Sequence, residues 1–440
     1  MEKADFIHLV RLSEKASAED SAGYRRSVAV FAALGYLWVA GCLALAILIL
    51  AVALSSTVSL HFRFGTALQF LMGGTLLLTT LRALWLPLDP PEGVKLQPKD
   101  APALFEALER IRRKIKGPPI DCVQIDGSFN ASITQLPRFG LLGGTTNYLT
   151  IGLPILMALD KARFLAVMSH EYGHLRGGHG RFSAWIYRTR LSWTKLEHGL
   201  GDSANIVTAA TQAFLRWYFP RFMAKTFAMA RQDEYEADRI AGKLLGREVA
   251  GAALTEIAIK GRWLQDEFWP QHWSAALHSF SPVGPFAAMR TLLTKSVNLD
   301  YAKEALRQSL SEISDVVDTH PVLRDRLEAL DVLHAGRQLP YLSSGAALEL
   351  LGAGAGKWVA HFDREWIRDN AVDWKQHHNY LRRVQARVAE LQASLPRNNA
   401  KEMTQLGDLQ LRLNAKANVL SCYERALQLS SGYAKALYGM

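Results

Sequence analysis

Cysteine is scarce in this sequence: the chain has only three in 440 residues, at Cys42, Cys122 and Cys422. Cys42 lies inside an apolar run, and the other two are far apart. Disulfide-rich domains and zinc sites built from cysteine pairs need several cysteines at short spacings, so the sequence excludes both. Such sparse cysteine is typical of a protein in a reducing compartment.

Charged residues are absent from two stretches near the amino terminus, residues 28–54 and 64–81. A helix of about 20 apolar residues crosses a bilayer, so the first stretch is long enough and the second is at the lower limit. The first stretch and its polar leader are both too long for a signal peptide. Residues 1–92 are therefore predicted to form a leader and a transmembrane helical hairpin, with spans at about 28–54 and 64–81.

Positive charge is scarce in the link between these two stretches, where Arg63 is the single cation. The flanking segments are richer in cations, with Lys3, Arg11, Lys15, Arg25 and Arg26 before the hairpin and Arg82, Lys95 and Lys99 after it. The positive-inside rule then places the leader and the bulk of the chain in the cytoplasm, which we interpret as the cytoplasmic face of a bacterial inner membrane. A net charge of +10 fits a protein lying against an anionic bilayer. No clustered basic motif points to nucleic acid.

Apolar periodicity and turn residues predict a mainly α-helical domain with a small antiparallel sheet over residues 93–365. Ala101–Lys116 has the pattern of an amphipathic helix, and 154–159 that of a short one. The strands are expected at 122–125, 131–136 and 147–151. This is an α+β architecture.

The remaining residues, 366–440, are predicted to form a helical tail. Its spacing matches the helix pair of a tetratricopeptide repeat, which has a period of about 34 residues. The matching positions are Leu406, Gly407, Asp408, Tyr423, Ala426 and Leu427, followed by a break at Ser430 and Ser431. An ordinary helical hairpin would give the same spacing, so both interpretations stay open. A single unit buries its faces incompletely, which favours a protein partner at the tail.

The segment His170-Glu171-Tyr172-Gly173-His174 follows an apolar, helix-prone run. Two histidines four residues apart project from one face of a helix and can bind one tetrahedral metal ion. Glu171 points about a quarter-turn away, towards a water on that metal. H-E-x-x-H is the signature of zinc peptidases, and average composition makes a chance match rare.

Two histidines leave a catalytic zinc ion short of one protein ligand. A metzincin would have a third histidine where this chain has Gly180, and His179 is one residue short of that position. The acidic segment 233–238 is the better candidate, because Glu234 and Asp238 share a helix face. Two carboxylates there repel each other unless a cation lies between them. Without the H-E-x-x-H pattern, a solvated acidic face would be the simpler interpretation.

Four motifs give the chain a resemblance to a known family. They are His170 to His179, Glu234-Tyr-Glu-Ala-Asp238, Thr319-His-Pro-Val-Leu-Arg-Asp-Arg326 and Asn130-Ala131. The chain resembles the HtpX-like and CaaX-prenyl-protease family of membrane zinc metallopeptidases, which are gluzincins. The motifs follow the family order over residues 93–330, and the first two are the more specific.

The resemblance implies one Zn²⁺ per chain, bound by His170, His174 and Glu234. Glu171 would be the general base that takes the proton from the zinc-bound water, whose pKa zinc lowers to about 7. Asp238 would orient a ligating imidazole.

The same resemblance implies two substrate contacts. His320 or Arg326 would face the oxyanion of the tetrahedral intermediate, although His320-Pro321 is also an ordinary turn before a helix. Asn130 and Ala131 would lie on an edge strand that pairs with an extended substrate, although both are also ordinary residues of a sheet.

The chain also departs from the family. CaaX-processing members have more membrane spans, so we do not expect prenylated substrates here. HtpX members have further apolar segments between the active helix and the glutamate ligand. In this chain residues 204–230 contain Arg216, Arg221, Lys225 and Pro220, so we expect buried core helices there rather than another span.

The sequence thus predicts a membrane-anchored zinc endopeptidase that hydrolyses membrane or membrane-associated proteins, damaged ones among them. The alternative is a membrane-tethered helical scaffold with an inert or structural metal site. Glu171 favours the enzyme, because a structural zinc site needs no base beside its ligand.

Overall fold

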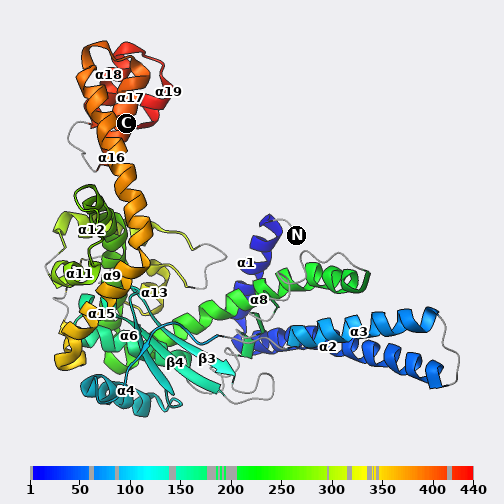
Figure 1. Ribbon diagram of the computed structural model, residues 1–440. Coiled ribbons are helices and arrows are strands. Elements are labelled where there is room, and N and C mark those ends of the chain that lie inside the picture. Colours follow the sequence, from blue (N-terminus) through cyan, green and yellow to red (C-terminus); the bar gives the residue numbers. More distant parts are fainter. Residues whose placement is uncertain are drawn as a thin grey trace.

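In the computed structural model, a central body of helices contains one small sheet, and further helices extend from this body at the two ends of the chain (Figure 1). A long helical pair extends from one side of a central body, and a single helix leads from the body to the carboxyl-terminal helices. The residues described are 3–58, 64–84, 89–137, 145–175, 185–186, 189–190, 193–194, 206–294, 297–314, 320–333, 339, 341–342, 346–413 and 419–439.

The amino-terminal part consists of α1 (Lys3–Glu19), α2 (Ser21–Val58) and α3 (Phe64–Leu84). Helices α2 and α3 lie side by side and carry many exposed apolar side chains (Figure 1). Among the described residues, Ser21–Thr57 is the one segment long and apolar enough to cross a membrane. This agrees with the first predicted span. The apolar part of α3, Phe64–Leu78, is shorter, so the second span and the membrane hairpin remain predictions.

The sheet contains β1 (Val94–Lys95), β2 (Cys122–Asp126), β3 (Ala131–Pro137) and β4 (Thr145–Gly152) in the order β1-β2-β4-β3. Strands β2 and β4 are parallel, whereas the other two pairs are antiparallel. The sheet is therefore mixed, and the prediction of an antiparallel sheet was wrong. Alternating side chains indicate which segments are strands, but not that β4 lies between β2 and β3. That order leaves β3 at one edge of the sheet.

Helices surround this sheet and form most of the body. Aliphatic side chains of the sheet, α4 and α5 share one buried core with Phe164, Met168 and Tyr172 of α6. The helices are α4 (Pro102–Ile115), α5 (Leu153–Ala158), α6 (Lys161–His174), α8 (Ile206–Leu245), α9 (Arg247–Trp263), η2 (Leu264–Phe268), α10 (Trp269–Ser274), η3 (Ala275–Leu277), α11 (Pro285–Thr294), α12 (Leu299–Ser311), α13 (Leu323–Ala329), η4 (Ala346–Gly354) and α15 (Ala355–Asp369). The predicted helices at 101–116 and 154–159 are confirmed as α4 and α5.

The segment expected to form core helices, residues 204–230, lies mostly in α8, which is one continuous helix containing Pro220. Tyr218 and Phe222 pack in a buried cluster with side chains of α2 such as Val28. This part of α8 therefore contributes to a core, as expected. Its Trp217 is 45% exposed.

The tail comprises α16 (Ala371–Ala393), η5 (Leu395–Arg397), α17 (Ala400–Arg412), α18 (Val419–Leu429) and α19 (Ala434–Gly439). Helices α17 and α18 form the predicted pair, packed so closely that a Cβ on Gly407 would lie 2.9 Å from the Tyr423 ring. Whether the pair is a tetratricopeptide repeat remains a prediction. The boundary at 366 stays a prediction. The first part of α16 packs on the body, because Trp374 is fully buried in an aromatic cluster with Trp273 and Trp366.

Candidate metal centre

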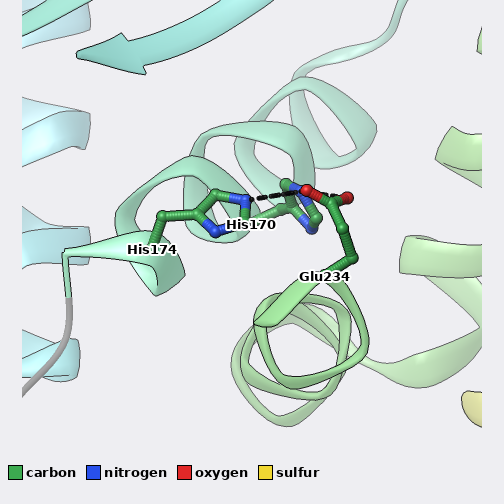
Figure 2. A group of neighbouring side chains, drawn as sticks. All are labelled: His170, His174 and Glu234. Carbon is green, nitrogen blue, oxygen red and sulfur yellow. Dashed lines mark hydrogen bonds and ion pairs between the residues drawn. The ribbon is translucent and has the colours of Figure 1, made fainter. Parts of the chain in front are cut away.

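Two helices, α6 and α8, bring the candidate ligands together. They cross most closely at Gly173, where a Cβ would lie 2.9 Å from Ala237 Cα. A residue without a side chain is thus needed in the middle of the H-E-x-x-H segment. This contact sets the histidines of α6 against the face of α8 that carries Glu234 (Figure 2).

His170, His174 and Glu234 direct nitrogen and oxygen atoms at one point (Figure 2). The two Nε2 atoms are 3.2 Å apart. His170 Nε2 lies 3.5 Å from Glu234 Oε2, and His174 Nε2 lies 3.4 Å from Glu234 Oε1. Ligands about 2.0–2.2 Å from a tetrahedral zinc ion are about 3.3–3.6 Å from one another. The group therefore fits a zinc ion in size and in donor chemistry.

The carboxylate of Glu234 gives a second reason to place a cation here. Glu234 is 5% exposed, and its Oε2 is buried without a hydrogen bond. That atom lies 3.0 Å from His320 Nδ1 and 3.7 Å from Arg326 Nη2, close enough for ion pairs. Ion-pair contacts without a well-aligned hydrogen bond leave this buried oxygen incompletely satisfied, and a metal ion would satisfy it.

Asp238, one turn after Glu234, contacts His170 from the side opposite the metal position. Its Oδ1 lies 2.8 Å from His170 Nδ1, which leaves Nε2 of that ring for a metal. Arg326 holds the same carboxylate with two hydrogen bonds, from Nη2 to Oδ1 at 2.6 Å and from Nε to Oδ2 at 2.8 Å. Asp238 therefore contacts the ring nitrogen of His170 that does not face the metal position, and its orienting role stays a prediction.

These contacts shift the pKa values of His170, Glu234 and Asp238. Burial lowers the pKa of His170, but its contacts with Asp238 and Glu234 outweigh burial and raise that pKa to about 9. Burial raises the pKa of Glu234, whereas the three neighbouring imidazoles of His170, His174 and His320 bring it well below its ordinary value. The pKa of Asp238 is likewise lowered, since Arg326 and His170 outweigh burial. Both carboxylates are therefore ionised at neutral pH, as metal binding requires.

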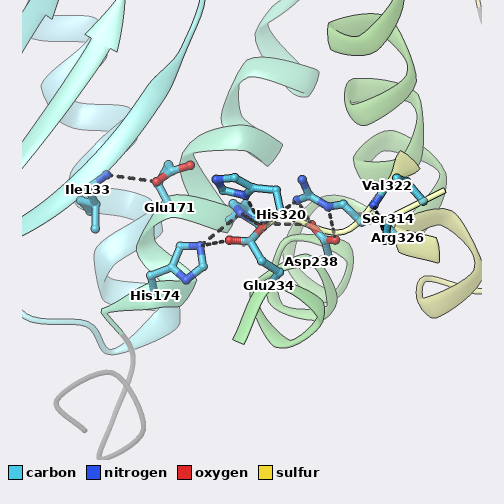
Figure 3. Close-up of polar contacts among 10 residues, drawn as sticks. Ile133, Glu171, His174, Glu234, Asp238, Ser314, His320, Val322 and Arg326 are labelled. Atoms are coloured by element: carbon cyan, nitrogen blue, oxygen red, sulfur yellow. Dashed lines mark hydrogen bonds and ion pairs between the residues drawn. The ribbon is translucent and has the colours of Figure 1, made fainter. Parts of the chain in front are cut away.

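Glu171 lies between the metal ligands and the sheet (Figure 3). Its Oε2 accepts a hydrogen bond of 3.1 Å from the backbone N–H of Ile133 on β3. This contact fixes the direction of the side chain and shows that the backbone N–H of Ile133 points away from β4. The edge of β3 thus borders the site.

The two predicted substrate-binding residues differ in orientation. The carbonyl oxygen of Asn130 accepts a hydrogen bond from Gly152 N at 2.8 Å, so its backbone is used within the sheet. Backbone groups alternate between the two sides of a strand, so Ala131 and Ile133 direct theirs to the free edge. An extended peptide would pair with Ala131 and Ile133, while Asn130 is one of the residues that line the cavity.

His320 and Arg326 both reach the site but occupy different environments (Figure 3). The Arg326 side chain is 14% exposed and is engaged with Asp238, whereas that of His320 is 71% exposed. Contact with the Glu234 carboxylate raises the pKa of His320. A hydrogen bond from Val322 N to Ser314 Oγ, 3.2 Å long, helps to hold the start of α13. His320 is thus the better placed of the two to face a substrate.

One cavity of about 590 Å³ contains all of these groups. Its polar part is formed by the metal-ligand group, Glu171 and His320. Another part is apolar and is lined by Phe129, Val167, Ala253, Leu254 and Ile257. The cavity has the size of a ligand pocket and could take an apolar side chain beside the polar centre.

Residues 127–334 match the family model described as Peptidase family M48. The match includes both histidines of α6, Glu234 and Arg326, and it supports a metallopeptidase of that family, for which zinc is typical. It excludes α1–α3 and the tail. No curated protein and no solved structure matches the chain.

Sequence reasoning missed several groups that shape the site. Gly173 stands in the last turn of α6, and a glycine within a helix is a local signal of close helix packing. Ile133 acts through its backbone, which no side-chain pattern reveals. The amino end of α6 is held by an ion pair between Arg163 and the fully buried Glu256, which also lies 2.6 Å from Lys260 Nζ. His179, the rival third ligand, lies outside the described residues.

Proposed function

We propose that this protein is a membrane-anchored zinc endopeptidase. The observation that supports this best is the convergence of His170, His174 and Glu234 in a cavity that also holds Glu171 and the free edge of β3. A structural metal site would need neither a carboxylate base nor an open cavity beside it. The match to Peptidase family M48 supports the same reaction class.

In this proposal the three ligands hold one zinc ion, and Asp238 with Arg326 keeps the His170 ring in position. Bound zinc would polarise the substrate carbonyl and lower the pKa of a water. The backbone of Ala131 and Ile133 pairs with an extended peptide and sets its scissile bond over the site. Glu171 takes the proton of the attacking water and passes it to the leaving nitrogen. His320 donates a hydrogen bond to the carbonyl oxygen as negative charge develops there.

The position of the protein in the cell follows from α2. We infer that α2 anchors the chain in a bilayer, that α3 returns it, and that the body lies in the bacterial cytoplasm. Its substrates are then membrane or membrane-associated proteins, misfolded ones included. The apolar part of the cavity favours a substrate with an aliphatic or aromatic side chain next to the scissile bond.

The experiment that tests this function uses the full-length protein, purified in detergent. We expect about one zinc ion per chain by mass spectrometry and cleavage of an unfolded substrate such as reduced casein. Cleavage should stop when a chelator removes the zinc and return when zinc is restored. A protein that binds zinc but never cleaves would support the scaffold alternative instead.

A further inference from the structure

The turn of α8 that carries Glu234 is held from a second side by the amino-terminal helices. Helix α1 packs along α8, and Glu14 of α1 forms an ion pair with Arg231. From the start of α2, the hydroxyl of Tyr24 donates a hydrogen bond of 2.9 Å to the carbonyl oxygen of Lys225. These contacts lie within ten residues of the candidate metal ligand, although they come from the part of the chain that leads into the predicted membrane anchor.

Arg25, in the first turns of α2, makes the contact closest to the ligand. Its Nη2 lies 3.2 Å from Asp233 Oδ1 and 3.5 Å from Glu236 Oε2. The side chains of Arg25 and Asp233 are only 14% and 15% exposed, so this ion pair is weakly screened by water. Asp233 and Glu236 flank Glu234 in sequence and line the same cavity.

Charge explains why this contact matters. Residues 233–238 carry four carboxylates, which repel one another on a single helix. Arg326 and the imidazoles balance Glu234 and Asp238. Arg25 compensates the other two, Asp233 and Glu236. Without Arg25, the carboxylates of Asp233 and Glu236 would lose this positive charge, and their repulsion of the Glu234 carboxylate would increase.

The backbone of α8 gives an independent reason. Pro220 lies inside this helix, and a proline removes one helical hydrogen bond and clashes with the preceding turn. The part of α8 after Pro220, residues 221–245, therefore depends on packing against other helices for its orientation relative to the first part. That part is held between α6 on one side and α1 with α2 on the other.

We propose that Arg25 is a positioning residue for Glu234. The first turns of α2, where the predicted membrane anchor begins, would then help to support the metal site. The inference rests on the proposed metal site. It adds that Glu234 reaches its place between the two histidines only when α2 is docked on α8 through Arg25.

The test compares Arg25→Ala and Arg25→Lys with Arg26→Ala in the full-length protein in detergent. Arg26 is the adjacent cation on α2 and is exposed, so it controls for loss of charge. Three quantities are measured: zinc affinity against a chromophoric chelator, the visible spectrum of the Co²⁺-substituted protein, and Tm. The cobalt spectrum reports coordination geometry, which a change in general stability does not alter.

We expect Arg25→Ala to weaken zinc binding about tenfold. This is the lower end of the loss in metal affinity that follows when a residue supporting a metal ligand is mutated. Its cobalt spectrum should change, while Arg26→Ala keeps the affinity and spectrum of the parent. Arg25→Lys should fall between them, because lysine keeps the positive charge but its ammonium group lacks the fixed planar geometry with which Arg25 Nη2 meets both carboxylates. If Arg25→Ala does not fold, a parental cobalt spectrum in Arg25→Lys would still overturn the proposal.

Two other results would also overturn it. Equal zinc affinity and equal spectra in Arg25→Ala and Arg26→Ala would show that Arg25 does not position Glu234. Tighter zinc binding in Arg25→Ala would show that Arg25 acts only as a charge opposing the metal. A parent protein that binds neither zinc nor cobalt would overturn the metal site itself, and this inference with it.

Discussion

Glu171 and Glu234 both line the cavity, but their surroundings differ and suit them to different roles in the proposed reaction. Glu234 is buried against three imidazoles, an environment suited to a metal ligand. Glu171 instead reaches the edge of β3, where a substrate backbone would lie. The two side chains can therefore be separated by experiment, because one should control metal content and the other only the reaction.

Replacing Glu171 by Gln should abolish hydrolysis and leave zinc bound. The amide can still accept the hydrogen bond from Ile133 N, but it cannot take a proton from water. We expect the rate of casein cleavage to fall at least about 100-fold, the range for loss of a general base. Zinc content, measured after dialysis, should stay at the parental level. Cleavage at the parental rate would refute the assignment of Glu171 as the base.

Replacing Glu234 by Ala should remove the zinc as well. The loss should exceed the roughly 10–100-fold weakening that follows from mutating an outer partner. Glu248→Ala is a suitable control, because Glu248 is an exposed carboxylate in the first turn of the next helix. Mass spectrometry after dialysis decides between them. If both variants kept zinc equally, His179 would become the candidate for the third ligand.

At the scale of elements, the site depends on how closely α6 and α8 approach. The helix carrying His170 and His174 could be predicted from the sequence, because its spacing is local. The residue pattern named the acidic segment 233–238 as the candidate, but the choice of Glu234 as the ligand came from the resemblance, since Glu234 lies 60 positions after His174. The order of the strands and the contact of Arg25 with Asp233 could not be predicted, because both depend on long-range packing that leaves no periodic pattern.

Gly173→Ala tests the crossing of α6 and α8. The new methyl would lie 2.9 Å from Ala237 Cα, so the helices must separate, at a cost of about 1–3 kcal/mol in unfolding free energy. Zinc affinity should fall too, because Glu234 moves with α8.

Gly356→Ala is the matched control: its Cβ meets nothing within 4 Å, and alanine favours a helix by up to about 1 kcal/mol. Chemical denaturation measures both. Equal stability changes would contradict the close crossing.

Ala253→Phe tests the apolar part of the cavity. Ala253 lines it from α9, so a phenyl ring there should take up part of the apolar space. In a peptide library, we expect the parent to prefer a large apolar residue beside the cleaved bond. The variant should shift that preference to small residues, by about 10-fold or more in kcat/KM, since a methylene in such a pocket is worth about 1–3 kcal/mol. An unchanged preference would place the subsite elsewhere.

At the scale of the molecule, helix α16 belongs to both the body and the tail. Its first part contributes the buried Trp374, whose indole N–H donates a hydrogen bond of 2.9 Å to Ser279 O. Its second part supplies Val384, Val388 and Leu391 to the core of the tail. The tail can therefore be removed without harming the body only if the first part of α16 is kept.

Two truncations make this testable. A chain ending at Ser394 should keep zinc and the parental rate on casein, because every candidate site residue and Trp374 remain. A chain ending at Asp369 loses Trp374, and emptying such a site costs about 3–5 kcal/mol. Its Tm should fall markedly. If the longer chain also lost zinc, the tail would have to be part of the catalytic body.

The continuity of α16 also fixes a distance. A helix of 23 residues is about 35 Å long and does not bend like a flexible linker. If the tail binds a protein, as predicted, that protein would be held at a fixed distance from the cavity. Its local concentration at the site would be high only for segments that match this distance. The length of α16 would then determine how far from the bound segment the substrate chain is cleaved.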